Sequence, residues 1–504
     1  MSNKIKILIA LVALFSVSFL SICGYITTSY LITGVSIGLL IVYIHDITQT
    51  KHSILQNFPV IGWLRFIFEN EGPKIKQYFV ENDINGTPIN REKRSDIYQK
   101  AKEDVNTVPF GTQLNVYEKG YEFFEPSLYP TDHKLMQEPR FLIGSKFCKK
   151  PYSASIVNIS GMSFGALSGV AIESLNGGAK LGNFYHNTGE GGLSKYHEKN
   201  GGDIVFQIGT GYFGCGKEVD GVRVFDEELF AEIVKSPQIK MVEIKISQGA
   251  KPGHGSVLPG KKHTKEIAEI RHTKEGTDLV TNPFHTAFHD AENLLIFIER
   301  VRELSGYKPV GIKLCLGSIK QFEELVKTMY IQKKYPDFIT LDGGEGGTGA
   351  APLAFANHMG TPLIDALQGV DKVLKDWDLR DEIKIIASGK ASTSFDVLKL
   401  IALGADGINM ARAFLMSLGC IQARECNLNT CPIGIATQDK NLQKGINPAE
   451  KRVRVYNFHK NLIKEIKELM GSIGILSLKE LDYSKLKVRN ENGVLTTYKN
   501  IHNG

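Results

Sequence analysis

Two apolar segments open the chain and differ from the sequence that follows. Residues 5–25 hold only apolar and small polar side chains after Lys6, and residues 30–44 form a second apolar run after a short uncharged turn. A helix needs about 20 apolar residues to cross a bilayer, a length that the first run nearly reaches and the second reaches only if residues 26–29 join it. The pattern predicts a transmembrane helical hairpin over residues 1–47.

Basic residues flank this hairpin on both sides, with Lys4 and Lys6 before it and Lys51, His52 and Arg65 after it. Because basic flanks stay in the cytoplasm, we expect both ends and the bulk of the chain there, with the hairpin in the lipid of the inner, cytoplasmic membrane. A cleaved signal peptide is the alternative, since one apolar run near the start is its mark. The second run and the lack of a clear A-x-A site weigh against it.

Residues 48–147 have a mixed pattern that predicts a connecting subdomain of helices and loops. Residues 53–69 are amphipathic and either pack on a core or lie on the membrane surface. Residues 91–104 are strongly charged and predict a helix, and turn-rich stretches follow at 109–113 and 126–132.

From about residue 153, short β-rich runs alternate with segments of helical pattern, and each run ends in a glycine or a polar cluster. The eight runs are residues 155–161, 183–189, 203–209, 241–247, 309–315, 336–342, 382–388 and 405–411. Eight strands that alternate with helices predict an α/β fold, a closed (β/α)8 TIM barrel over residues 148–440. A doubly wound open sheet is the alternative, and the absence of a dinucleotide fingerprint after the first strand counts against it. Residues 441–504 predict a helical tail.

The composition agrees with this fold and argues against one class of partner, nucleic acid. Of 504 residues, 42% are hydrophobic and 23% charged, which is ordinary globular material with enough apolar residues for a barrel core. The net charge of +6 comes from dispersed lysines rather than from a basic run interleaved with aromatic residues. A nucleic-acid partner is therefore not expected.

Three of the seven cysteines are clustered, which points to a metal. Cys420, Cys426 and Cys431 have the spacing C-x5-C-x4-C and are followed by Pro432. Thiolates favour zinc and iron-sulfur clusters, and three ligands without an adjacent fourth suit a three-iron cluster better than a closed zinc site. Reduced thiols in a packed loop, or a four-iron cluster with an exogenous ligand, remain the alternatives.

Glycine runs and polar side chains follow the predicted strands, where barrels carry their functional groups. The glycine runs are residues 161–165, 187–192 and 342–350, and the polar residues at other strand ends are Gln207, Lys245, Gln248, Lys251 and Lys313. Glycine amides form anion-binding nests, and phosphate sites in barrels often follow strands seven and eight, here at Gly389 and Ala411. The rim therefore predicts a phosphate-bearing cofactor, and a lysine such as Lys313 would suit the N1 side of a reduced flavin.

These motifs carry a family resemblance over about residues 150–440. The runs SGMSFGALS, HNTGEGG, KISQGAKPGHGSVLPG, DGGEGGTGAAP and GCIQARECNLNTCPIGIATQ resemble, in the same order, the FMN-binding synthase domain of glutamate synthase. The N-terminal half resembles the stand-alone, membrane-anchored bacterial proteins of this family, with less distinctive matches.

The resemblance implies FMN at the C-terminal face of the barrel and a 3Fe-4S cluster beside it, held by Cys420, Cys426 and Cys431. The flavin contacts that it implies, together with the neighbouring rim residues, are Met162, Ser163, Gln207, Lys245, Gln248, Lys313, Gly343, Gly344, Gly389 and Ala411. It implies 2-oxoglutarate at Lys251 and Arg271, and we place Gly165 beside them. A dicarboxylate needs cations, and arginine can bind a carboxylate through two parallel hydrogen bonds.

The implied reaction is reductive. Ammonia condenses with 2-oxoglutarate to 2-iminoglutarate, and a hydride from the reduced flavin, fed with electrons through the cluster, gives L-glutamate. Lys251 is a catalytic candidate as well as a binding one, and Glu190 is the candidate for handling protons or orienting ammonia. A hydrogen bond that fixes the loop is an equal alternative for Glu190.

The chain also departs from the large glutamate synthases. No glutaminase domain is recognised in it, so we expect ammonia from solution or from a separate amidotransferase, and electrons from a donor protein or reductase. Val257 stands where the large enzymes carry glutamine, and GGEGGTGA replaces GHDGGTGA. Two other functions therefore stay open: an FMN oxidoreductase acting on another amino acid or 2-oxo or 2-hydroxy acid, and a non-catalytic, membrane-bound electron-transfer subunit.

Overall fold

The structure, a computed structural model, describes residues 8–9, 11–13, 16 and 26–498. The chain divides into two compact units, Met1–Gly86 and Thr87–Gly504. The division falls inside the predicted connecting subdomain, and the larger unit contains the predicted barrel as well as the predicted tail.

The smaller unit is helical over the residues that the structure describes. It contains α2 (Ile26–Thr48), α3 (Ser53–Asn57), α4 (Trp63–Ile75) and the π-helical turn η1 (Lys76–Val80). The buried carboxylate of Asp46, near the end of α2, accepts hydrogen bonds from the Val60 amide at 2.8 Å and the Trp63 indole at 3.0 Å. This carboxylate ties the end of α2 to the start of α4, because a buried charge is stable only when its hydrogen bonds are made. The amphipathic segment 53–69 is thus two helices, α3 and the start of α4.

The predicted membrane hairpin is not supported. Its first segment, residues 5–25, lies almost entirely outside the described residues, and its second segment is part of α2. Across the described part of the chain, no helix is both long enough and apolar enough to cross a bilayer.

The larger unit is built on a closed parallel barrel of eight strands, in the order β12-β13-β14-β15-β4-β5-β6-β9. The strands are β4 (Val157–Ile159), β5 (His186–Asn187), β6 (Ile204–Ile208), β9 (Ile239–Lys245), β12 (Val310–Leu314), β13 (Phe338–Asp342), β14 (Lys384–Ser388) and β15 (Gly407–Met410). Each lies in or overlaps one of the eight predicted runs, so the barrel is confirmed. Because β15 pairs with β4 and the sheet closes, the doubly wound alternative is excluded.

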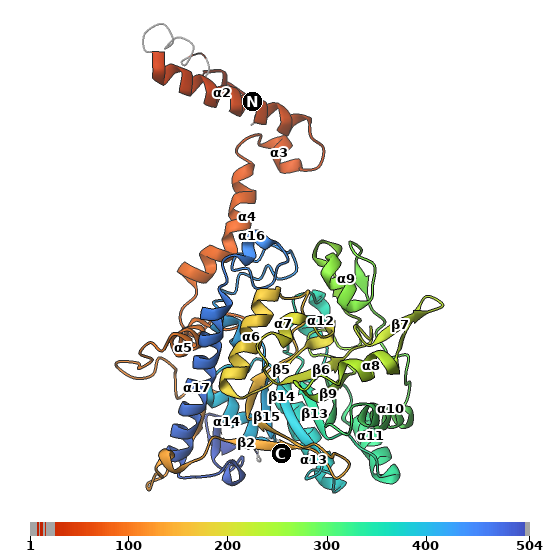
Figure 1. The fold of residues 1–504 in the computed structure, drawn as a ribbon. Coiled ribbons are helices and arrows are strands. Elements are labelled where there is room, and N and C mark those ends of the chain that lie inside the picture. Colours follow the sequence, from red (N-terminus) through yellow and green to blue (C-terminus); the bar gives the residue numbers. More distant parts are fainter. Residues whose placement is uncertain (1–7, 10, 14–15, 17–25, 499–504) are drawn as a thin grey trace. The chain divides into compact units, whose positions relative to one another are not determined.

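A helix follows every strand of the barrel (Figure 1). In chain order these helices are α6 (Gly169–Gly182), α7 (Lys195–Glu198), α8 (Glu227–Ile233), α10 (Ala291–Leu304), α11 (Ile319–Gln332), α13 (Leu363–Asp376), α14 (Ser394–Ala402) and α15 (Arg412–Ser417). Their starts follow from local sequence: the side chains of Ser168 and Ser318 cap α6 and α11, and Thr393 with Asp396 forms a capping box on α14.

Further elements decorate the barrel. Two helices stand in the loops after strands, α9 (Lys265–Arg271) and α12 (Leu353–His358), and α16 (Lys440–Gln443) follows the cysteine loop. The short strands are β1 (Glu122–Phe124), β2 (Arg140–Ile143), β3 (Tyr152–Ser155), β7 (Gly216–Val219), β8 (Val222–Phe225), β10 (Val257–Leu258), β11 (Leu279–Val280), β16 (Leu486–Arg489) and β17 (Leu495–Thr497). In Figure 1, α9 and α16 lie toward one end of the barrel and β2 toward the other.

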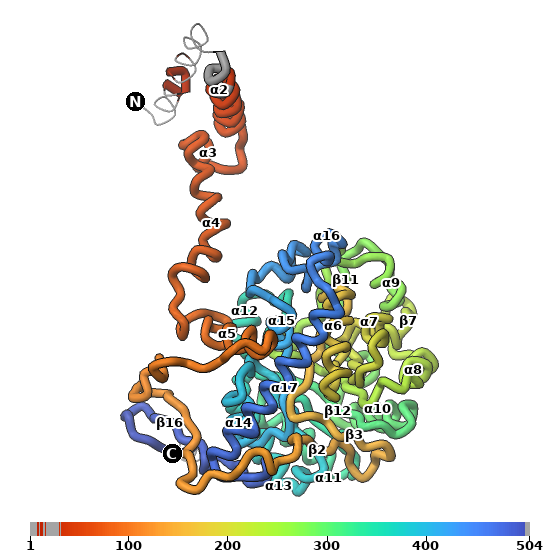
Figure 2. Tube along the Cα trace, turned by 60° about the vertical axis from the view of Figure 1, so that its left-hand side comes forward, coloured from red at the N-terminus to blue at the C-terminus, as the bar shows by residue number. Residues whose placement is uncertain are grey.

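The helix α17 (Pro448–Ile473) joins the tail to the barrel. It packs against α6 and against α5 (Arg91–Lys102), the charged helix that the sequence predicts, and lies beside α14 in Figure 2. A Cβ atom on Gly178 of α6 would come within 2.3 Å of the Val455 side chain, so this glycine permits the close approach of the two helices. The predicted helical tail, residues 441–504, thus contains α17 and also the strands β16 and β17.

Candidate active site

The predicted site residues converge at one rim of the barrel. Met162 and Ser163 follow β4, Gln207 is in β6, Lys245 ends β9, Lys313 is in β12, Gly343 and Gly344 follow β13, Gly389 follows β14, and Ala411 follows β15. Gln248 lies in the loop after β9 and is half-buried. Because parallel strands end on the same side, residues far apart in the sequence share this rim.

Glu190 lies in a short 3₁₀ turn, η3 (Gly189–Gly191), and is held by two donors. Its Oε1 atom accepts hydrogen bonds from Lys245 Nζ at 2.7 Å and from Ser256 Oγ at 2.7 Å. Burial by itself would raise the pKa of Glu190, but the charge and hydrogen bond of Lys245, the Ser256 hydroxyl and the charge of Lys251 lower that pKa to about 2. Glu190 is therefore ionised near neutral pH, which suits holding a cation, and its low pKa makes it a weak base.

We expect Glu190→Gln to destabilise the fold near pH 7 because the buried Lys245 ammonium would lose its charge partner. A carboxyl with a depressed pKa contributes stability above its unfolded value of 4.5 and loses it as the pH falls toward about 2. The difference in unfolding free energy between wild type and variant should therefore be largest near neutral pH and shrink as the pH falls from 4.5 toward about 2, as measured by urea unfolding. The exposed Glu218→Gln serves as the charge control, and a difference that is independent of pH would contradict the assignment.

Lys251 brings a second buried cation to Glu190. Its Nζ atom donates to the Gly255 carbonyl at 3.0 Å, and no described carboxylate forms an ion pair with it. Burial, assisted by the nearby charge of Lys245, lowers the pKa of Lys251, whereas the charge of Glu190 opposes this shift. Lys251 is thus a desolvated ammonium that lacks a direct anionic partner.

Arg271, the last residue of α9, is the third cation. One of its Nη atoms donates to the Phe164 carbonyl at 3.0 Å, and the guanidinium lies 4.9 Å from the centre of the Phe213 ring. Its Nε atom is buried without a hydrogen-bond partner in the described structure. Burial lowers the pKa of Arg271 to about 10, and the charge of Glu190 acts against this shift. A buried guanidinium with an unused donor is ready to take an anion.

Two glycines make room for this guanidinium. A Cβ atom on Gly165 would lie 2.8 Å from an Arg271 Nη atom, and one on Gly191 would lie 3.0 Å from the same atom. Gly165 also has a φ of +106°, which favours glycine. The structure therefore places Gly165 beside Arg271 and adds Gly191, which the sequence did not single out.

Lys313 faces a carboxylate across the rim. Its Nζ atom lies 3.8 Å from Asp342 Oδ2, and the same oxygen accepts the Gly249 amide at 2.7 Å. A Cβ atom on Gly249 would lie 1.8 Å from the Gly343 carbonyl, so the loops after β9 and β13 touch through their backbones. Gly343, Gly344 and Gly389 likewise pack closely against protein atoms, so their lack of a side chain serves the packing of the rim whether or not a ligand is bound.

Glu243 is a site residue that the sequence interpretation missed. It is 1% exposed inside the barrel, where its carboxylate accepts hydrogen bonds from Gln207 at 2.6 Å, Asn187 at 2.8 Å and Thr340 at 2.5 Å. Side chains alternate along a strand, so Glu243 shares a face with Lys245. The sequence signal for Glu243 was a carboxylate two positions before the lysine that ends the strand. The hydrogen bonds of Glu243 fix the orientation of the Gln207 amide.

The three clustered cysteines occupy the loop that follows α15. All are free thiols, and the tyrosine hydroxyl of Tyr98 donates to the Cys420 carbonyl at 2.6 Å. Lys262 is 2% exposed, and its Nζ atom donates to the carbonyls of Ala166 at 2.9 Å and Cys426 at 3.0 Å. A Cβ atom on Gly349 would lie 3.4 Å from Cys426 Cβ, so this loop adjoins the glycine run after β13.

The thiols are not arranged as a finished metal site. Among the described residues, no group of three His, Cys, Asp or Glu side chains is placed to hold a metal ion. The donor chemistry nevertheless fits an anionic iron-sulfur cluster, because three thiols lie in one loop beside a buried ammonium that has no carboxylate partner in the described structure.

Comparison with known proteins identifies the family of this chain. The family described as "Conserved region in glutamate synthase" matches residues 128–476, more than half of the chain. The chain belongs to the glutamate synthase family. It is 37% identical to the "Glutamate synthase large subunit-like protein YerD" of Bacillus subtilis over 500 residues, 91% of this chain and 94% of that protein. The resemblance that the motifs predict is confirmed.

Other relatives are longer than this chain. It is 36% identical to the "Archaeal glutamate synthase [NADPH]" of Methanocaldococcus jannaschii over 66% of its own length and 62% of that protein. Among solved structures, the flavin-binding domain of baker's yeast flavocytochrome b2 overlaps 84% of this chain and 85% of its own, with 13% identity and a TM-score of 0.44. That overlap is too loose to support a conclusion about this chain.

Proposed function

We propose that this protein is an oxidoreductase of the glutamate synthase type that acts on the CH–NH2 group and forms L-glutamate from 2-oxoglutarate and ammonia. One observation carries the proposal: Lys245, Lys251 and Arg271 surround the single carboxylate of Glu190. Two positive charges are left without a direct counter-charge in a buried setting, which suits a dianion. The names of the relatives, a glutamate synthase and a glutamate synthase large subunit-like protein, support the same type of reaction.

The roles of the residues follow from their positions. Arg271 would bind one carboxylate of 2-oxoglutarate through parallel hydrogen bonds, and Lys251 would bind the other end as a point charge. Glu190, ionised and fixed by Lys245 and Ser256, would orient ammonium beside the keto carbon.

The rim residues fit FMN in their chemistry. When bound, FMN supplies the hydride that reduces the imine of 2-oxoglutarate. Gln207 would present an amide held in place by Glu243, and Lys313 would compensate negative charge on the reduced ring. The remaining contacts would come from Met162, Ser163, Lys245, Gln248, Gly343, Gly344, Gly389 and Ala411.

Cys420, Cys426 and Cys431 would hold a 3Fe-4S cluster. Such a cluster, when bound, supplies one-electron transfer between an external donor and the flavin. The position of Cys426 beside Gly349 supports this route, since the same glycine run begins at the rim with Gly343 and Gly344. The electron donor would be a separate protein or reductase, and ammonia would come from solution or from a separate amidotransferase.

The test is reoxidation of the flavin without oxygen. Anaerobically purified protein is reduced with dithionite, and its visible flavin absorbance is followed after 2-oxoglutarate, ammonium or both are added. We expect the absorbance to return only with both substrates, together with one glutamate per flavin. A flavin that stays reduced when 2-oxoglutarate and ammonium are both present would refute the proposed reaction. Reoxidation by a different 2-oxo acid, and not by 2-oxoglutarate, would identify that acid as the substrate.

Location at the cytoplasmic membrane stays a prediction from the two apolar runs of the sequence. Exposed apolar side chains on α2, among them Val35, Ile37 and Ile41, are compatible with contact to lipid. Fractionation of cells tests it: recovery of the full-length protein in the membrane pellet after a carbonate wash is the expected result, and recovery in the supernatant would reject it.

A further inference from the structure

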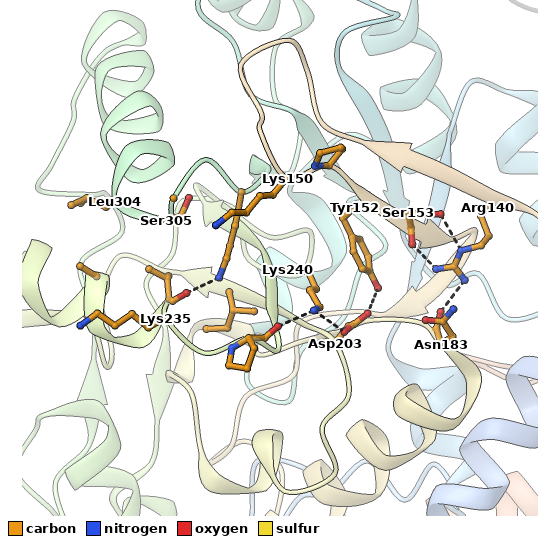
Figure 3. A pocket seen from close by; sticks show the side chains of 17 residues that line it. Arg140, Lys150, Tyr152, Ser153, Asn183, Asp203, Lys235, Lys240, Leu304 and Ser305 are labelled. Carbon is orange, nitrogen blue, oxygen red and sulfur yellow. Dashed lines mark hydrogen bonds and ion pairs between the residues drawn. The ribbon is translucent and has the colours of Figure 1, made fainter.

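A cavity lies at the end of the barrel opposite to the candidate active site. Its volume is about 900 Å³, within the range of small-molecule sites. The lining residues precede strands rather than follow them: Asn183 precedes β5, Asp203 precedes β6, Pro237 precedes β9 and Lys308 precedes β12. We name it the basal cavity, and Figure 3 shows its lining.

Positive charge dominates the lining of the basal cavity. Five cations line it, namely Arg140, Lys150, Lys235, Lys240 and Lys308, with Asp203 as the one carboxylate among the lining residues. Arg140, Lys235 and Lys240 have carboxylates within 4 Å, the last at 3.7 Å from Asp203. Asp203 is also engaged by the Tyr152 hydroxyl at 2.9 Å. Among the described residues, Lys150 and Lys308 form no ion pair.

The two unpaired lysines converge on one turn. A Cβ atom on Gly306, in the turn between α10 and β12, would lie 3.2 Å from Lys150 Nζ, and Lys308 follows two residues later. Lys308 Nζ donates to the Val234 carbonyl at 2.6 Å. Burial, together with the charges of Lys150 and Lys240, lowers the pKa of Lys308 to about 8. Three ammonium groups therefore repel one another across a concave, partly desolvated surface.

The other residues that line the basal cavity indicate which kind of anion it binds. Four apolar side chains that are exposed or half-buried stand beside the ammonium groups, those of Pro151, Ala231, Pro237 and Leu304. A cationic or purely apolar ligand would leave the lysines uncompensated, and a bare inorganic ion would leave the apolar surface uncovered. Lysines bind phosphate as point charges, whereas planar carboxylate recognition favours arginine.

We propose that the basal cavity binds a small organic phosphate, with the phosphate on Lys150, Lys240 and Lys308 and the organic part on the apolar side. This site is separate from the candidate active site, because the two lie at opposite ends of the same strands. The inference does not depend on the proposed reaction.

The test uses the full-length protein and two probes, ADP and inorganic pyrophosphate, in isothermal titration calorimetry at low salt without divalent cations. We expect saturable one-to-one binding, tighter for ADP than for pyrophosphate. Lys150→Gln should weaken ADP binding by about tenfold, because one charged hydrogen bond is lost. Lys150 is exposed and this variant is expected to fold; Lys240→Gln gives a second test.

Two controls make the result decisive. Lys180→Gln removes one charge from the exposed face of α6 and should leave ADP binding unchanged. An excess of 2-oxoglutarate should not displace ADP. No saturable binding of either probe, pyrophosphate binding as tight as ADP, equal weakening by Lys180→Gln, or displacement by 2-oxoglutarate would each overturn the proposal.

Discussion

Arg271→Gln is expected to raise the KM for 2-oxoglutarate by about a hundredfold or more, the cost of removing one partner of a buried, hydrogen-bonded charge pair. The guanidinium is 4% exposed, stacked near Phe213 and left with a free Nε donor, so its charge is held ready for a carboxylate. Arg271→Lys should fall between wild type and Arg271→Gln, because it keeps the charge but loses the planar fork. Initial rates of anaerobic flavin reoxidation at varied 2-oxoglutarate measure the effect.

The same variant should change specificity as well as affinity. With Arg271 on the carboxylate distant from the keto group, a 2-oxo acid that lacks this carboxylate, such as 2-oxobutyrate, does not need Arg271, so the preference for 2-oxoglutarate over it should fall by a similar factor. Gly165→Ala is a gentler probe, since its Cβ would displace the guanidinium without removing the charge. Arg300→Gln, at an exposed arginine of α10, is the control. An unchanged KM in Arg271→Gln with flavin still bound would refute the substrate site.

Cys426→Ser is expected to abolish iron binding and electron delivery from an external donor, while flavin reduced directly with dithionite is still reoxidised by substrate. A three-ligand cluster has no spare thiolate to lose, and a serine oxygen is a poor ligand for it. Iron and sulfide analysis of anaerobically purified protein measures the first effect, and substrate-driven reoxidation measures the second.

Cys148→Ser is the matched control, because Cys148 is a half-buried thiol outside the cysteine loop whose Sγ atom contacts the Tyr307 carbonyl. It should keep its iron. Iron retained in Cys426→Ser, or lost equally in Cys148→Ser, would show that the cysteine loop does not hold the cluster.

The sequence predicted the barrel because barrel strands carry a local signal. Each of the eight strands lies in or overlaps a short run that contains β-branched or aromatic residues, and each was found within a few residues of its predicted place. Once eight parallel strands are recognised, the grouping of Gln207, Lys245 and Lys313 at one rim follows from topology alone.

The N-terminal segment shows the limit of such patterns. Residues 30–44 are apolar enough to suggest a membrane span, yet the structure gives no support for one in the described residues. Several apolar side chains of α2, among them Val35, Ile37 and Ile41, are exposed, so an apolar run by itself does not say what its side chains contact.

The sequence by itself determined the closed barrel, the helix α5, the tail helix and the residues that gather at the rim, because these depend on periodicity and on the direction of strands. Only the tertiary structure decided that Glu190 pairs with Lys245, that Glu243 holds Gln207, that Gly191 borders Arg271 and that the basal cavity is lined by five cations. These contacts join residues tens to more than a hundred positions apart. Which side chains meet across such distances depends on loop paths and burial, and no short stretch of sequence carries that information.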